Sequence, residues 1–247
     1  MQRIRTLTVG ALVTGLAVLS LLSGCAWFSR EDTRPAHELA QDGMDDYKKG
    51  RYSSAIETFE RLKDWYPFSK YAILAELKIG DAYYKKEEYE DAVFAYEEFL
   101  NLHPRNEAVP YVMYQIGRCY FDQVDTVDRD QANTLKALES FNKLVERYPV
   151  DSYARRARPH IAVCIKTLAG HDLYVGRFYF KSRYYKAALT RFLAVLNDYP
   201  DVGLQHDALQ YLTILEAEIK RADDGSRHYF PGDNPMEQKQ EPPAPDK

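Results

Sequence analysis

The sequence has 247 residues and carries 33 Lys and Arg against 37 Asp and Glu, so its formal net charge is −4. This acidic balance disfavours a nucleic-acid partner, because binding to phosphates requires a basic face. No G-x-S-x-G motif, phosphate-binding loop or paired catalytic constellation is present, and we do not expect an enzyme. The six His residues show no i, i+3 or i+4 pairing, so we predict neither a metal site nor a cofactor.

The first 24 residues are typical of a secretory signal peptide. Arg3 and Arg5 precede an uncharged stretch that ends in Leu22-Ser23-Gly24-Cys25. Small residues directly before a Cys predict cleavage ahead of Cys25 in the manner of bacterial lipoproteins. The alternative, a transmembrane helix, needs about 20 apolar residues, whereas this stretch is shorter and contains Gly, Ser and Thr. We therefore predict that Cys25 is lipidated.

The residues after Cys25 predict where the lipid anchor lies. Position 26 is Ala rather than Asp, and in the lipoprotein class that this segment resembles an Asp there favours retention at the inner membrane. We therefore expect an outer-membrane anchor, with the body of the protein on the periplasmic face. Two or more acyl chains hold a protein stably at a membrane. Residues 25–35 would connect this anchor to the folded part as a tether.

An internal repeat begins after the tether. Four times an Ala is followed four residues later by an aromatic residue and twelve residues later by a Pro: Ala55/Phe59/Pro67, Ala92/Tyr96/Pro104, Ala137/Phe141/Pro149 and Ala188/Phe192/Pro200. A Gly precedes each Ala, at Gly43, Gly80, Gly117 and Gly176. This is the tetratricopeptide pattern, in which each unit is an antiparallel helix pair. The sequence predicts an all-α superhelix of about four to five helix pairs, lipid-anchored through Cys25.

Small and aromatic residues explain the pattern physically. Gly in the first helix and Ala in the second let the two helices approach closely, and the aromatic residue fills the space between units. The Pro ends the second helix, because it lacks a backbone donor and disfavours helix in the residue before it. Residues 36–150 are predicted to hold the first three units.

Two departures from the repeat lie in the second half of the chain. Eight extra residues place an enlarged acidic loop at 122–131, between the two helices of the third unit. Fourteen further residues, close to four helical turns, predict one long helix or two nearly collinear ones over about 153–181. Residues 151–222 would thus hold the long helix, the fourth unit and a capping helix. We expect the Pro-rich tail at 223–247 to be disordered.

Two cysteines remain in the body of the protein, Cys119 and Cys164. Both lie at the same position of successive first helices, and packed helix axes are about 8 to 10 Å apart. A disulfide requires Cα atoms within about 7 Å. We expect two buried thiols, although an oxidising periplasm leaves a disulfide as the alternative.

Several stretches go beyond a generic repeat. They are Tyr66-Pro67-Phe68, Tyr111-Val112-Met113-Tyr114, Asp128-Arg129-Asp130, and Phe141 to Val145 followed by Tyr148-Pro149. These stretches resemble the BamD family, the lipoprotein subunits of the outer-membrane β-barrel assembly machinery. The similarity covers nearly the whole mature chain to about residue 222. The loop near residue 125 is shorter than in some members, and no helix that completes a fifth repeat is recognisable.

The resemblance implies a function in folding and inserting outer-membrane β-barrel proteins. Its implied partners are unfolded outer-membrane proteins, the periplasmic domains of the central barrel subunit, and other assembly lipoproteins. Arg191 matches a family Arg implicated in contact with the central subunit, whereas the alternative is an ordinary solvated Arg. The alternative function is a periplasmic scaffold lipoprotein that organises envelope or peptidoglycan proteins through the same repeats.

A candidate groove for unfolded clients follows from the repeat. In tetratricopeptide units the first helices line the inner surface, and the position four residues after the Gly faces it. These residues are Tyr47, Tyr84, Phe121 and Phe180; the predicted client site adds Tyr114, Tyr66 and Phe68. Aromatic rings and Tyr hydroxyls suit an extended strand with aromatic side chains. The alternative is that these aromatics pack between neighbouring units.

Overall fold

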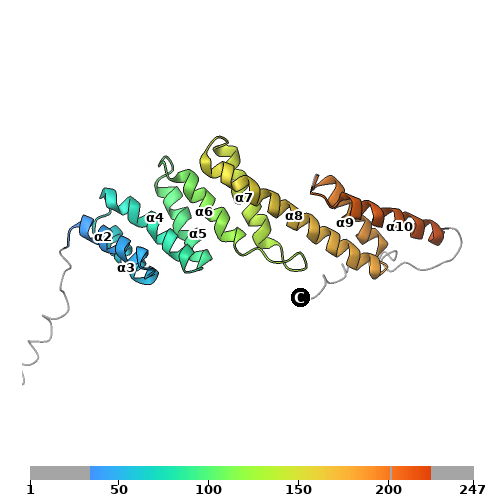
Figure 1. Ribbon diagram of the computed structural model, residues 1–247, viewed down its shortest axis with the longest axis horizontal. Coiled ribbons are helices and arrows are strands. Elements are labelled where there is room, and N and C mark those ends of the chain that lie inside the picture. The colour runs from blue at the N-terminus through green and yellow to red at the C-terminus, as the bar shows by residue number, and fades with distance from the viewer. Residues whose placement is uncertain (1–33, 201, 224–247) are drawn as a thin grey trace, which may run out of the picture.

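The computed structural model describes residues 34–200 and 202–223 (Figure 1). Within them the chain forms nine helices and no strand: α2 (Ala36–Lys48), α3 (Tyr52–Trp65), α4 (Lys70–Lys85), α5 (Tyr89–Leu102), α6 (Val109–Phe121), α7 (Ala132–Arg147), α8 (Ser152–Lys181), α9 (Tyr185–Asn197) and α10 (Gln205–Asp223). The predicted signal peptide, the lipidation of Cys25 and the tail beyond α10 fall outside the described residues. None of the described helices is long and apolar enough to span a bilayer.

The helices pack as successive antiparallel pairs. The pairs are α2 with α3, α4 with α5, and α6 with α7, and the second half of α8 pairs with α9. Figure 1 shows them side by side in a row, with α8 running from the α6 and α7 pair to α9 and α10. The described part is therefore all-α and built from helix pairs.

The repeat Gly leaves space for an aromatic ring of the second helix in the same unit. A Cβ atom added to Gly43, Gly80, Gly117 or Gly176 would lie 2.4–2.6 Å from a ring carbon of Phe59, Tyr96, Phe141 or Phe192, respectively. All four rings are completely buried. Two of them also stack on the next first helix, Phe141 on His160 at 5.3 Å and Phe192 on Tyr211 at 5.0 Å between ring centroids. One ring thus fills the space both within its unit and between units.

The turn between the two helices of a unit has a left-handed residue. Gly50, Glu87 and Arg183 each lie seven residues after the repeat Gly and have φ values of 75°, 62° and 64°. A Gly adopts this conformation without strain, whereas a residue with a Cβ loses about 1 kcal/mol. In the third unit this tight turn is replaced by the enlarged loop.

The enlarged loop at residues 122–131 lies against the middle of α8. A Cβ atom at Gly170 would come within 2.9 Å of Val127 Cγ1, and His171 Nδ1 lies 2.7 Å from the Val127 carbonyl oxygen. The loop is also held from inside, because Gln131 Nε2 donates to the carbonyls of Thr126 and Arg129, both at 2.9 Å. The eight extra residues therefore brace the long helix against the third unit.

The long helix α8 belongs to two cores. Its first half contributes Ala154, Ala157 and Cys164 to a core with α6 and α7. Its second half contributes residues from Leu173 to Tyr179 to a core with α9 and α10. The helix begins with a side-chain cap, since Asp151 Oδ1 accepts from Tyr153 N at 2.7 Å. A single helix thus joins the amino-terminal units to the carboxyl-terminal half.

Both described cysteines are free thiols buried in the helix packing. Burial raises the pKa of Cys119 to about 12 and that of Cys164 to about 11. At neutral pH both thiols are protonated and act as small apolar side chains.

Candidate protein-binding surface

The aromatic residues four positions after the repeat Gly face the next first helix. They are Tyr47, Tyr84, Phe121 and Phe180, and each is partly buried. Lys78 Nζ of α4 lies 5.2 Å from the centroid of the Tyr47 ring. The centroids of Phe121 and His160 of α8 are 4.4 Å apart, and those of Phe180 and Tyr211 of α10 are 5.7 Å apart. These contacts are the packing between units that the sequence left open as the alternative.

Tyr84 is fixed by a charged pair on the next unit. Its hydroxyl donates to the carboxylate of Asp122 and accepts from Arg118 Nη2 at 3.0 Å. Arg118 in turn pairs with Asp122 at 2.9 Å. Burial, followed by the bond to Asp122, holds the pKa of Tyr84 above its ordinary value. The hydroxyl of Tyr84 therefore joins α4 to the carboxyl end of α6.

A second set of aromatic residues packs against the first. Tyr52, Tyr89 and Tyr185 open the second helices and pack on Tyr47, Tyr84 and Phe180, with ring centroids 5.5, 5.8 and 5.8 Å apart. Sequence reasoning missed these residues, although each lies five positions after its partner, a spacing visible in three units. They stabilise the turn and cover part of the rings of Tyr47, Tyr84 and Phe180, which reduces the exposed surface of these predicted groove residues.

The prediction that Tyr114 lines the client groove is wrong, since only 3% of the residue is exposed. Its ring packs against Phe141 and Tyr153, Arg156 stacks over it at 4.8 Å, and its hydroxyl lies 3.1 Å from His160 Nε2. Tyr114 lies on the predicted helix, but α7 and α8 cover it. It belongs to the core of the third unit.

Asp81 forms a buried polar joint between the second and third units. The residue is 3% exposed, and its Oδ1 accepts from the hydroxyls of Tyr96 at 2.7 Å and Tyr111 at 2.6 Å. Lys78 Nζ lies 2.7 Å from Oδ2. Burial, followed by the Asp81 charge, raises the pKa of both Tyr residues above the ordinary value. Tyr111, in one of the stretches that carried the resemblance, therefore contributes to packing between units.

The carboxyl end of α3 and the turn that follows it expose large aromatic side chains. Phe68 is fully exposed, and Trp65, which the sequence analysis did not single out, is 43% exposed. The predicted site residue between them, Tyr66, packs against the core of the first unit and donates its hydroxyl to the Arg34 carbonyl at 2.9 Å. Phe68 and Trp65 have no comparable burial. Of the predicted client site, Phe68 is thus the residue most open to another molecule.

Arg191 forms an ion pair with Asp172 of α8 and remains partly exposed to solvent. Its Nη1 lies 2.9 Å from Oδ1 of Asp172, a residue that is only 7% exposed, while 38% of the Arg191 side chain faces solvent. Burial, followed by the charge of Asp172, also raises the pKa of neighbouring Tyr199 to about 12. The guanidinium is therefore held in place by α8, and part of the Arg191 side chain stays exposed to solvent.

Arg191→Met is expected to lower the free energy of unfolding by about 1–2 kcal/mol. Breaking a buried ion pair costs about 3–5 kcal/mol, and the partial exposure of Arg191 reduces this figure. Urea unfolding followed by circular dichroism measures the change. Lys143→Met is the control, because Lys143 pairs with Glu139 at an open surface and no measurable change is expected. Equal free energies of unfolding for Arg191→Met and Lys143→Met would show that the ion pair between Arg191 and Asp172 adds no measurable stability.

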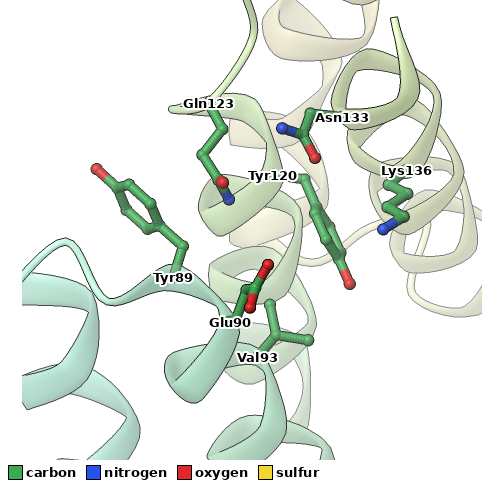
Figure 2. A pocket seen from close by; sticks show the side chains of 7 residues that line it. All are labelled: Tyr89, Glu90, Val93, Tyr120, Gln123, Asn133 and Lys136. Atoms are coloured by element: carbon green, nitrogen blue, oxygen red, sulfur yellow. The ribbon is translucent and has the colours of Figure 1, made fainter. Parts of the chain in front are cut away.

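A small pocket lies between α5, α6 and α7 (Figure 2). Its volume is about 200 Å³, and Tyr120 stands at its centre between Glu90 of α5 and Lys136 of α7. Lys136 Nζ lies 5.4 Å from the Tyr120 ring centroid. Pockets for small molecules usually measure about 300–1,000 Å³, so this hollow is a packing gap beside the enlarged loop. Among the described residues, no group of three or more His, Cys, Asp or Glu could hold a metal ion.

Repeated helix pairs, each with an aromatic ring seated on a Gly, define a tetratricopeptide-repeat protein whose exposed side chains suit protein binding. The chain belongs to the YfiO family, described as an outer membrane lipoprotein, whose profile matches residues 32–228. Relatives bear the name outer membrane protein assembly factor BamD. The Caulobacter vibrioides protein is 32% identical over 90% of this chain and 76% of its own length. The Vibrio cholerae protein is 30% identical over 83% of this chain and 92% of its own length.

Solved structures similar to this chain include other tetratricopeptide proteins. The TPR2AB domain of yeast Sti1, solved as a complex with pHSP90, is 16% identical, and the match covers 78% of this chain and 78% of its own, with a TM-score of 0.42. A tetratricopeptide repeat protein from Parabacteroides merdae is 15% identical and covers 76% of this chain and 75% of its own, with a TM-score of 0.40.

Proposed function

We propose that the chain is an outer-membrane lipoprotein of the machinery that folds and inserts β-barrel proteins. Cys25 carries the anchor on the periplasmic face, the amino-terminal units receive unfolded outer-membrane proteins, and the carboxyl-terminal half binds periplasmic domains of the central barrel subunit. Other assembly lipoproteins are further partners. Family membership over residues 32–228, with relatives named outer membrane protein assembly factor, carries this proposal.

The exposed turn between α3 and α4 supports a client site in the amino-terminal units. Large exposed aromatics on a folded protein mark binding surfaces, and Trp65 and Phe68 offer two within four residues of the sequence. An unfolded β-barrel protein presents alternating apolar side chains, which aromatic residues bind well. Tyr47 and Tyr84 lie near the carboxyl ends of α2 and α4, at the opposite end of these helices from the turn, and offer a second, partly buried contact. The client surface is thus centred on Phe68.

A photo-crosslinker at position 68 is expected to capture an unfolded outer-membrane protein through its last strand. Phe68 is fully exposed, so the substitution should not disturb the fold. Capture is measured on gels after irradiation of the purified chain with a denatured, labelled β-barrel protein. Deleting the last strand of the client should reduce capture at least about fivefold, because the apolar and aromatic side chains of that strand supply most of the contact with Phe68.

Position 150 provides the matched control for this experiment. Val150 follows the Pro of the third unit as Phe68 follows the Pro of the first, and it is 85% exposed. A crosslinker at position 150 should capture little client. Equal capture at both positions, or capture that ignores the last strand, would contradict a client site in the amino-terminal units.

Arg191 supports a partner site in the carboxyl-terminal half. Asp172 binds Nη1 of its guanidinium, and 38% of the Arg191 side chain faces solvent. A pre-positioned Arg loses little entropy when it binds a carboxylate, and such pairs form strong hydrogen bonds. This arrangement fits an acidic group on the central barrel subunit.

A further inference from the structure

The first half of α8 is a first helix without a second helix. It packs on α6 and α7 as the next unit would, and Ala162 takes the place of the repeat Gly. Gly43, Gly80, Gly117 and Gly176 are all buried under a ring of their own second helix, whereas Ala162 is exposed. The chain continues straight into the second half of α8 instead of turning back. The position of a second helix is therefore vacant.

One continuous face of α8 borders this vacancy. It consists of Arg155, Arg158, Pro159, Ala162, Val163 and Lys166, all of them exposed, and we call it the open face of α8. The spacing of three, four, seven and eleven residues places them on one side of a helix. Val163 is 47% exposed, and with Pro159 and Ala162 it forms an apolar strip flanked by positive charges.

The charges on the open face have no acidic partner in residues 34–200 and 202–223. Arg155 and Arg158 donate to the backbone carbonyls of Val150 and Pro149 at 2.7 and 3.4 Å, and Lys166 pairs with no carboxylate. The sequence from residue 152 to residue 171 contains no Asp or Glu. In a chain with a net charge of −4, this is a local positive surface. Such a surface attracts an acidic molecule.

We propose that an acidic amphipathic helix of a partner protein docks on the open face of α8, in the place of the missing second helix. Its apolar side chains would cover Pro159, Ala162 and Val163, in the way that a helix fills a groove with residues at i, i+3, i+4 and i+7. Its carboxylates would pair with Arg155, Arg158 and Lys166. This surface lies between the client site and Arg191 along the chain, and it does not depend on the function proposed above.

The second helices of this chain supply the probes. The α5 sequence, Tyr89–Leu102, contains Glu90, Asp91, Glu97 and Glu98 and no Lys or Arg. The α9 sequence, Tyr185–Asn197, has the same repeat pattern but contains Lys186 and Arg191 and no acid. Stapled, fluorescent peptides of both helices, titrated with the full chain in detergent, report binding by anisotropy. Staples are needed because isolated helices of this length are marginal in water.

The α5 peptide is expected to bind at least about tenfold more tightly than the α9 peptide and than a scrambled α5 peptide. Arg155→Glu combined with Arg158→Glu should weaken α5 binding about tenfold and leave the unfolding curve unchanged, because both side chains are exposed. Lys220→Glu, at an exposed position of α10, should leave binding unchanged.

Several outcomes would overturn the proposal. Equal binding of the α5, α9 and scrambled peptides, or α5 binding that ignores the double charge reversal, would remove the helix site. Binding of phosphatidylglycerol vesicles that is lost in the double variant, without α5 binding, would assign the face to a membrane surface. A variant ending at Asp223 that binds the α5 peptide more than about tenfold tighter would assign the face to the chain's own tail. Self-association lost in the double variant would assign it to a second copy.

Discussion

Replacing Gly117 with Leu is expected to lower the free energy of unfolding by about 3 kcal/mol. A Cβ at this position would lie 2.4 Å from a ring carbon of Phe141, and that ring is completely buried between Gly117, α7 and His160. Overpacking a core costs about 1–3 kcal/mol and sometimes more. The gain in helix propensity on removing a Gly is about 1 kcal/mol and offsets only part of this loss. Guanidinium unfolding followed by circular dichroism measures the change.

A double-mutant cycle separates the ring contact from general disruption. Gly117→Ala should cost about 1 kcal/mol, and Phe141→Leu in the same chain should relieve the clash, so that the two changes couple favourably by about 1 kcal/mol. Gly170→Ala is the control, because its Cβ would meet only the tip of Val127 in a loop, which can rotate away. Additive effects of Gly117→Ala and Phe141→Leu would contradict the interpretation that Gly117 leaves the space that the Phe141 ring fills.

Asp81→Ala is the second large effect, with an expected loss of about 3 kcal/mol. The substitution leaves the hydroxyl of fully buried Tyr96 and that of Tyr111 without their acceptor, and it leaves Lys78 without its carboxylate. A buried donor that loses its partner costs about 1–3 kcal/mol, and a broken buried ion pair about 3–5 kcal/mol. Thermal or urea unfolding of the purified chain measures the loss.

Two further variants test whether the hydroxyls are the cause. Asp81→Asn keeps an acceptor oxygen and should lose about 1–2 kcal/mol. Adding Tyr96→Phe and Tyr111→Phe to Asp81→Ala removes the orphaned donors and should restore part of the stability, since replacing both partners of a hydrogen bond is nearly neutral. A loss below about 1 kcal/mol for Asp81→Ala would show that the joint between the second and third units does not rest on this carboxylate.

The helix pairs could be predicted because small and aromatic residues recur at a fixed spacing in each unit. Gly117 and Ala137 lie twenty residues apart instead of twelve, and this difference alone located the enlarged loop. The contact of that loop with α8 could not be predicted, because it depends on the position of Val127 relative to Gly170 in the folded chain. The left-handed turns at Glu87 and Arg183 were also hidden, since neither residue type favours that conformation.

The client site was harder to predict than the fold for a physical reason. An aromatic residue on a first helix serves equally well for contact with the next unit and for contact with a partner. Tyr84 is engaged by Arg118 and Asp122, and Tyr114 is covered by α8, so both spend much of their surface inside the solenoid. Phe68 lies in the turn after α3 and Trp65 is the last residue of α3, so neither belongs to the first-helix positions on which the groove prediction rested. Exposure there could be read only from the packed structure.

Depletion of this chain in its host, followed by quantification of folded β-barrels in the outer membrane, tests the central claim most directly. Folded barrels are counted by their heat-modifiable mobility on gels. The proposed function predicts that folded barrels fall as the chain is depleted and recover when it is supplied again. Intact levels of folded barrels, with an altered envelope shape, would contradict assembly of outer-membrane proteins and favour the scaffold alternative.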